Sequence, residues 1–181
     1  MKKLCLCISL VSVLLLCGCG SKAEEKMFSE FSTRLSQRTD LGFVGKLRCE
    51  YDDRTVNFTL QYRQQDRGSK ITVLQPAELE GLSVSLDENG SVLEYGELFI
   101  DTGDLDHFGL SPLSALPKLV EGLKNAHVDS VSTQGDMMMF TLIPSDELKM
   151  DVYFDRDMKP VRAELISEGQ VKVFCDIESW R

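Results

Sequence analysis

The chain has 181 residues, of which 43% are hydrophobic and 27% are charged, a composition that fits one globular domain with its own core. It carries 20 basic and 29 acidic side chains, a formal net charge of −9. This balance argues against nucleic-acid binding, because phosphates require a basic surface. It also disfavours binding to anionic lipid headgroups, so membrane contact would require a covalent anchor.

The first nineteen residues predict an export signal. Two lysines precede an apolar run at 4–16, which is too short for a membrane-spanning helix. Leu16-Cys17-Gly18-Cys19 then resembles the bacterial lipobox, in which an aliphatic residue and two small residues precede an obligatory cysteine. The resemblance implies that 1–18 are a cleaved signal peptide and that Cys19 receives a diacylglyceryl group. Two or three acyl chains, such as palmitate, give stable anchoring at about 0.8 kcal/mol per buried methylene.

An ordinary cleaved signal peptide and an uncleaved anchor are the alternatives to this lipoprotein interpretation. The Cys-x-Cys pairs at 5/7 and 17/19 are a poor match to a metal site, because ligand pairs are normally separated by two to four residues in a folded frame. Without residues 1–18, 18 basic side chains face 29 acidic ones, a net charge of −11. We expect the chain on the extracytoplasmic face of the cell membrane, with no cofactor besides the lipid on Cys19.

A short polar leader at 19–25 is expected to tether a single folded domain at 26–181. The domain begins with a predicted helix, because Phe28, Phe31 and Leu35 share one helical face. The only tryptophan, Trp180, is expected to pin the end of the chain against this helix. So brief a tether predicts that the domain lies close to the membrane.

Period-two alternation of apolar and polar residues predicts eleven strands beyond this helix. They are expected at 43–51, 56–63, 69–74, 82–86, 92–95, 98–100, 128–132, 137–143, 148–155, 161–166 and 170–177. A second helix interrupts them after the sixth strand, with Ser111 as its N-cap and Pro112 at its first position.

These elements predict an α+β fold that is mostly antiparallel β. A sheet of about ten or eleven strands with one apolar face must curl into a half-barrel or close on itself, and we expect the curled half-barrel. The helices are then expected to pack on its concave side.

The arrangement resembles the LolA/LolB-like lipoprotein-carrier superfamily, which includes germination-type lipoproteins of spore formers. The resemblance covers nearly all of the domain. The segments that carry it are 42–47, 63–73, 75–82, 87–95 and the closing hairpin of 152–155 with 160–163.

The resemblance implies a hydrophobic cavity for acyl chains between the sheet and the helices. The residues expected to line it are Leu47, Phe58, Leu60, Leu113, Val120, Met150, Val152 and Phe154. The alternative is that these residues form a filled core, because an open cavity leaves dispersion contacts unmade.

Cys49 and Cys175 are the two cysteines of the expected mature domain. In an exported protein such a pair can form a disulfide. Both lie on apolar faces of predicted strands, which is equally typical of two buried thiols. The sequence leaves the pairing open.

Nothing in the sequence predicts an enzyme, since no nucleophile stands in a motif with its base. His107 lies near Asp101, Asp104 and Asp106, but this loop lacks the downstream glutamate of a calcium site, so we expect no metal. The prediction is therefore a non-enzymatic, membrane-anchored envelope lipoprotein that binds acyl chains or a lipoprotein, or serves as a scaffold for a protein partner. An exposed sheet edge would allow strand addition or a homodimer. The alternative function is an accessory role in spore germination or sporulation, acting through protein partners.

Overall fold

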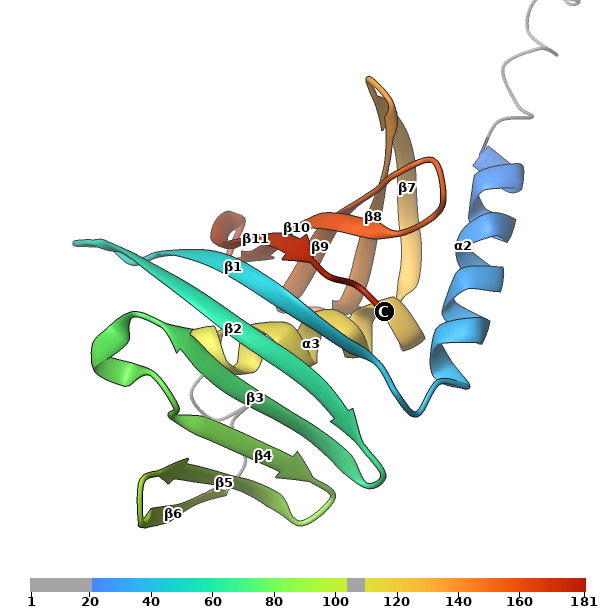
Figure 1. The fold of residues 1–181 in the computed structure, drawn as a ribbon. Helices are drawn as coiled ribbons and strands as arrows, with labels where there is room; N and C mark the ends of the chain where they lie inside the picture. The colour runs from blue at the N-terminus through green and yellow to red at the C-terminus, as the bar shows by residue number, and fades with distance from the viewer. Residues whose placement is uncertain (1–20, 104–109) are drawn as a thin grey trace, which may run out of the picture.

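The computed structural model describes residues 21–103 and 110–181, which form two α-helices, one short 3-10 helix and eleven strands (Figure 1). Their bounds are α2 Ser21–Ser36, β1 Gly42–Glu50, β2 Thr55–Gln65, β3 Gly68–Gln75, η1 Ala77–Leu79, β4 Ser83–Asp87, β5 Gly90–Tyr95, β6 Leu98–Gly103, α3 Pro112–Asn125, β7 His127–Gln134, β8 Met137–Ser145, β9 Leu148–Phe154, β10 Pro160–Ser167 and β11 Gln170–Glu178. All eleven predicted strands and both predicted helices are present.

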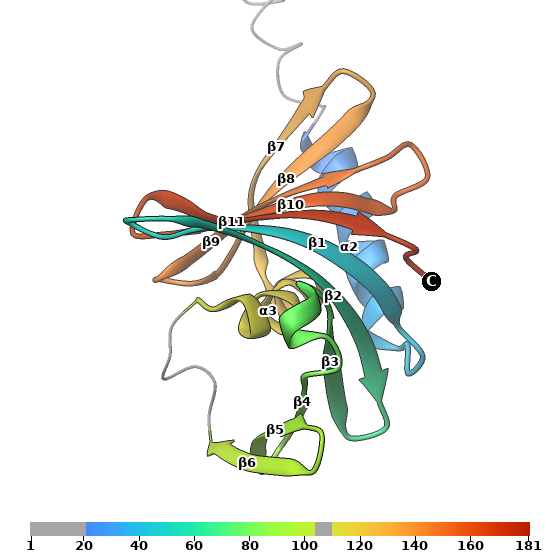
Figure 2. The same ribbon diagram turned by 60° about the vertical axis from the view of Figure 1, so that its left-hand side comes forward.

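The strands form one antiparallel sheet in the order β6-β5-β4-β3-β2-β1-β11-β10-β9-β8-β7. The first and last strands of the chain meet in the middle of the sheet, where Leu47 lies opposite Cys175. The sheet curls strongly but does not close, so β6 and β7 are its two edges (Figures 1 and 2). The predicted α+β fold with a curled half-barrel is confirmed.

Helix α3 lies inside the curl and packs against β1, β2, β3, β8 and β10. Ser111 caps its N-terminus: the Ser111 hydroxyl accepts from the Ser114 backbone N–H, and the Ser114 hydroxyl accepts from the Ser111 N–H. Pro112 occupies the first turn, where a missing N–H costs no helical hydrogen bond. The predicted start of this helix is therefore confirmed.

Helix α2 packs beside α3 and along β7. It begins at Ser21, inside the stretch expected to be a polar leader. The predicted apolar face is correct, since Phe28, Phe31 and Leu35 are all buried. The Ser32 hydroxyl donates to the Lys124 carbonyl at 2.7 Å and so links the two helices. Neither helix is long and apolar enough to cross a membrane, within the part of the chain that the structure describes.

The core lies between the two helices and the central strands of the sheet. Its largest fully buried side chains include Phe140, Phe154, Leu60, Leu116, Leu119 and Met150. Strands β4 to β6 extend beyond this core, and their large apolar side chains are buried only at Val84 among the described residues. Among the described residues, helices therefore cover one end of the sheet, and no helix covers the other, the bare end (Figure 2).

Candidate functional site

The eight residues predicted to line a cavity face the helices from one side of the sheet and from α3. Leu60, Met150, Val152 and Phe154 have no accessible surface. Leu47 and Val120 are also buried. Since water does not reach the first four side chains, they belong to a filled core in this conformation. An acyl chain could enter between them only if the helices moved.

Aromatic rings from α2 occupy the space over this part of the sheet. Phe31 packs edge-on against Phe154 with ring centroids 5.0 Å apart, and Phe28 packs against Phe140 at 5.2 Å. Phe140 and Phe154 also meet each other edge-on at 5.4 Å. Such pairs add to the stability gained from burial alone. The remaining two predicted lining residues, Phe58 and Leu113, lie partly buried at the margin of the core.

A pocket of about 510 Å³ opens where the last turns of α2 meet the end of the chain. Its apolar wall consists of Phe31, Leu35, Met158 and Trp180. Trp180 lies 6.5 Å from Phe31 between ring centroids, so the predicted contact between the end of the chain and the first helix is confirmed.

The rim of this α2 pocket is cationic, although the chain as a whole is acidic. It is formed by Arg34, Arg38, Lys159 and Arg181. The Asp40 carboxylate accepts a hydrogen bond from the Arg38 guanidinium at 3.2 Å and compensates its charge. Sequence reasoning missed this site, because Arg34 and Arg38 are four residues apart in the chain but Lys159 and Arg181 join them only through the fold.

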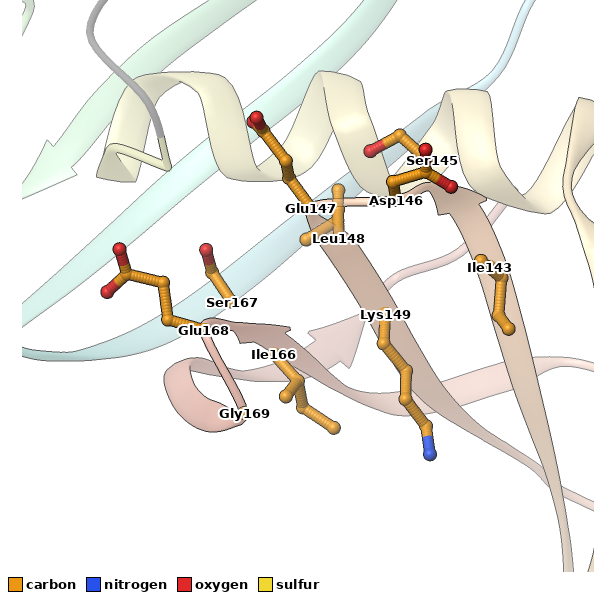
Figure 3. A pocket seen from close by; sticks show the side chains of 10 residues that line it. All are labelled: Ile143, Ser145, Asp146, Glu147, Leu148, Lys149, Ile166, Ser167, Glu168 and Gly169. Atoms are coloured by element: carbon orange, nitrogen blue, oxygen red, sulfur yellow. The ribbon is translucent and has the colours of Figure 1, made fainter.

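A second pocket, of about 630 Å³, lies between the turns that follow β8 and β10 (Figure 3). Its polar lining includes Asp146, Glu147, Glu168 and Lys149. Figure 3 shows Glu147 and Glu168 pointing to one side of the two turns, while Lys149 points to the other. No imidazole or thiol is part of the lining.

The bare end of the sheet exposes large apolar side chains. On β6, Leu98, Phe99 and Ile100 are 54%, 67% and 43% exposed. Tyr95 and Val92 of β5 are also exposed. The period-two pattern of the sequence identified this strand, but it gave no sign that a helix would fail to cover it.

Cys49 and Cys175 are free, buried thiols in the structure. Cys49 lies opposite Val173, and Cys175 lies opposite Leu47, so the two are diagonal neighbours on the β1–β11 pair. Burial raises the pKa of Cys49 to about 11, and it raises the pKa of Cys175 further. Both thiols therefore stay protonated and unreactive at neutral pH. Two free, buried thiols are the arrangement that the buried-thiol alternative describes.

Several predicted features lie outside the described residues. These are the signal peptide, the lipid attachment site Cys19, and the loop residues Asp104, Asp106 and His107. In the described ranges, 21–103 and 110–181, no group of three or more His, Cys, Asp or Glu side chains is arranged to hold a metal ion.

Comparison with protein-family models and with curated protein sequences gives no match. Comparison with solved structures gives many. An uncharacterised conserved protein from Thermus thermophilus superimposes with a TM-score of 0.51 and 11% identity, over 86% of this chain and 84% of that one. A DUF1329 family protein from Desulfovibrio piger gives 0.50 and 9%, over 87% and 91%. At such low identity the likeness shows a shared fold.

A LolA superfamily protein from Nitrosomonas europaea is also similar, with a TM-score of 0.49 and 8% identity over 85% of this chain and 90% of that one. The open, curled antiparallel sheet with its helices inside is the arrangement that the predicted elements implied. In fold, the chain is similar to these solved structures.

Proposed function

We propose that this chain is a lipid-anchored envelope lipoprotein that acts as a non-enzymatic scaffolding domain. The lipid on Cys19 would hold it at the extracytoplasmic face of the membrane, and the folded domain would hold a protein partner there. The lipobox-like segment 16–19 supports the anchor. Helix α2 begins at Ser21, two residues after Cys19, so the folded domain would lie against the membrane.

The exposed apolar edge of the sheet is the observation that carries the scaffolding role. The predicted cavity residues are packed against aromatic rings of α2, whereas β6 presents three large apolar side chains to solvent. Exposed apolar surface of this kind marks sites of interaction. The best-formed contact surface is therefore on the outside of the domain.

The anchor is tested by labelling cells that express the chain with an alkyne-bearing fatty acid. The mature protein should carry the label and should begin at residue 19 by mass spectrometry. Cys19→Ala should abolish labelling, while the matched variant Cys17→Ala keeps a small residue in the motif and should retain it. Labelling that survives in Cys19→Ala would refute the anchor.

The scaffolding role is tested by placing a photo-crosslinking residue at position 99 of β6 in cells. A discrete crosslinked protein should appear there, and should be missing when the same residue is placed at Ser130, which is exposed on the opposite edge strand β7. Equal crosslinking from both edges would contradict the proposal.

The α2 pocket favours a second candidate function, the binding of an anionic amphiphile such as a fatty acid. Its apolar wall fits a hydrocarbon chain, and its cationic rim fits a carboxylate or phosphate. Native mass spectrometry of the purified chain should then detect a bound lipid that is lost in Trp180→Ala and retained in Leu98→Ala at the bare end. A protein without lipid would favour the scaffold alone.

A role in spore germination is a narrower form of the scaffolding proposal. It predicts that deleting the gene in a spore-forming host leaves sporulation intact and impairs germination. It also predicts that the Cys19→Ala chain does not restore germination.

A further inference from the structure

Strand β6 is the one edge of the sheet whose side chains are apolar and whose surroundings are acidic. Within the described residues it pairs with β5 on one side and with no strand on the other. The backbone N–H and C=O groups along its free side can therefore accept another strand. Natural proteins usually block such edges with lysine, proline or a covering helix, and β6 contains neither lysine nor proline.

The two faces of β6 differ, which defines what a partner strand must present. On one face, Ile100 continues an apolar row across the sheet, since Ile71 pairs with Val84, Val84 with Leu93, and Leu93 with Ile100. Leu98 lies on the same face, two residues before Ile100. A strand added beside β6 would extend this row with its own apolar side chains.

The other face carries carboxylates. Asp101 pairs with Val92, and Phe99 pairs with Glu94, so both carboxylates lie on the face opposite Ile100. Phe99 and Val92 lie on this face as well, so alternate residues of an added strand would meet an apolar row on one face and carboxylates beside apolar side chains on the other.

Charge around β6 is of one sign. The sequence contains no Lys or Arg between Lys70 and Lys118. The described carboxylates of this stretch are Glu78, Glu80, Asp87, Glu88, Glu94, Glu97 and Asp101. Lys70 on β3 is already paired with Glu94 at 2.7 Å between Nζ and Oε2. The negative charge is thus largely uncompensated, and a docking segment must bring positive charge.

We infer that β6 is the docking strand for an extended, cationic segment of a partner protein, in which apolar residues alternate with Lys or Arg. This inference rests on the proposed scaffolding function and names the chemistry of its partner. A second copy of the chain fits poorly, because two such acidic ends would repel each other. An anionic membrane surface fits poorly for the same reason.

The inference is tested on the full chain in dodecyl maltoside with a synthetic peptide of eight residues that alternates valine and lysine. At saturation, amide hydrogen exchange at 98–103 should slow by about tenfold or more, as expected when a strand pairs with the edge. The amides of β7 at 127–134 should not change. The same peptide with glutamate in place of lysine should have no effect.

Three further measurements make the test specific. Raising NaCl from about 50 to about 500 mM should weaken peptide binding by about tenfold or more. Asp101→Asn, which keeps an acceptor for the Gly103 N–H, should weaken it several-fold. Ile100→Lys should weaken it by about tenfold, and the matched variant Ser130→Lys on the opposite edge should leave it unchanged.

Four outcomes would overturn the inference: equal protection of β6 and β7, equal binding of the two peptides, protection of β6 by self-association without peptide, or protection by anionic vesicles in place of the peptide. If one of these outcomes occurred while fatty-acid labelling still depended on Cys19 and crosslinking was still confined to β6, only the proposed chemistry of the partner would be wrong. The anchored scaffold would then stand. Loss of the labelling or the crosslinking would instead count against the proposed function.

Discussion

The two ends of the sheet are built from similar alternating strands, but their edge strands differ in helix cover and in the polarity of their exposed side chains. At the β7 end, α2 packs along the edge, and the exposed side chains of the strand are polar: His127, Asp129, Ser130, Ser132, Thr133 and Gln134. At the β6 end no helix of the described residues covers the strand (Figure 2), and its most exposed large apolar side chain is Phe99. An exposed apolar edge carries a risk of aggregation. Because the opposite edge of the same sheet is protected, the exposure of β6 indicates that this edge binds a partner.

The packing of helices on one end of the sheet also determines which part of the fold contributes most to the free energy of unfolding. Phe28 and Phe31 from α2, together with Phe140 and Phe154 from β8 and β9, form one aromatic cluster at the covered end. The bare end has Val84 as its one fully buried large apolar residue among those described. We therefore expect the covered end to carry most of the unfolding free energy and the bare end to contribute little.

Replacing Phe154 should have the largest effect. Phe154→Ala removes edge-on contacts with three rings and leaves a cavity, so it should lower the free energy of unfolding by about 3–5 kcal/mol. Phe99→Ala at the bare end removes an exposed ring and should change it by less than about 0.5 kcal/mol. Urea unfolding of both variants measures the difference. Similar losses in the two would mean that the ends are equally structural.

The fold could be predicted from the sequence because the alternation and the turns are local signals. The apolar residues at 43, 47 and 49 and those at 58, 60 and 62 each mark one strand face, and the structure buries that face or packs it against the core. The helix start at Ser111 was likewise readable from its cap. Element order then left few ways to arrange one large antiparallel sheet.

The candidate sites could not be predicted in the same way, because they depend on which face a helix covers. The sequence grouped the eight apolar residues correctly on one side, but only packing shows that Met150 and Phe154 have no accessible surface. The same limit applies to Arg34 and Arg181, which share a pocket rim although they are far apart in the sequence. Exposure of Ile100, on the face that α3 covers elsewhere, depends equally on which strands α3 reaches.

Close packing of α3 against the sheet gives a second test of the covered end. A Cβ atom at Gly45 would lie 2.9 Å from a Leu116 methyl carbon and 3.1 Å from the Cys175 sulfur. Gly45→Ala should therefore cost about 1–3 kcal/mol of unfolding free energy through overpacking. Gly42→Ala is the matched control, because its nearest neighbour would be the Tyr62 carbonyl at an ordinary 3.7 Å. Thermal unfolding that ranks the two in the reverse order would contradict this packing.

A smaller effect is expected from the hydrogen bond that joins the two helices. Ser32→Ala removes the donor to the Lys124 carbonyl and should cost about 1 kcal/mol. Ser36→Ala removes an exposed hydrogen bond within α2 and should cost clearly less. Hydrogen exchange of the α2 amides in both variants would show whether α2 loosens from α3, since Ser32→Ala alone should speed it.

The smallest stability effect, and the sharpest test of the bare end, concerns Lys70. The hydrogen bond from Lys70 to Glu94 is the largest of the effects that hold the pKa of the Glu94 carboxyl below its usual value of 4.5. Because the folded pKa is depressed, the pair stabilises the protein above about pH 4.5, and this stabilisation is lost as the pH falls through the folded pKa. The pair is partly exposed, so Lys70→Met should cost no more than about 0.5 kcal/mol.

Lys70→Met should nevertheless raise the pKa of Glu94 in an NMR titration and strengthen binding of the valine–lysine peptide several-fold. The variant removes the cation that already occupies Glu94 and leaves this carboxylate free for the lysines of an added strand. Lys46→Met is the matched control, because Lys46 pairs with Glu178 at the same 2.7 Å on the β1–β11 pair, away from β6. If both variants change peptide binding equally, net charge alone attracts the peptide, and β6 is no more a docking strand than any other acidic part of the surface.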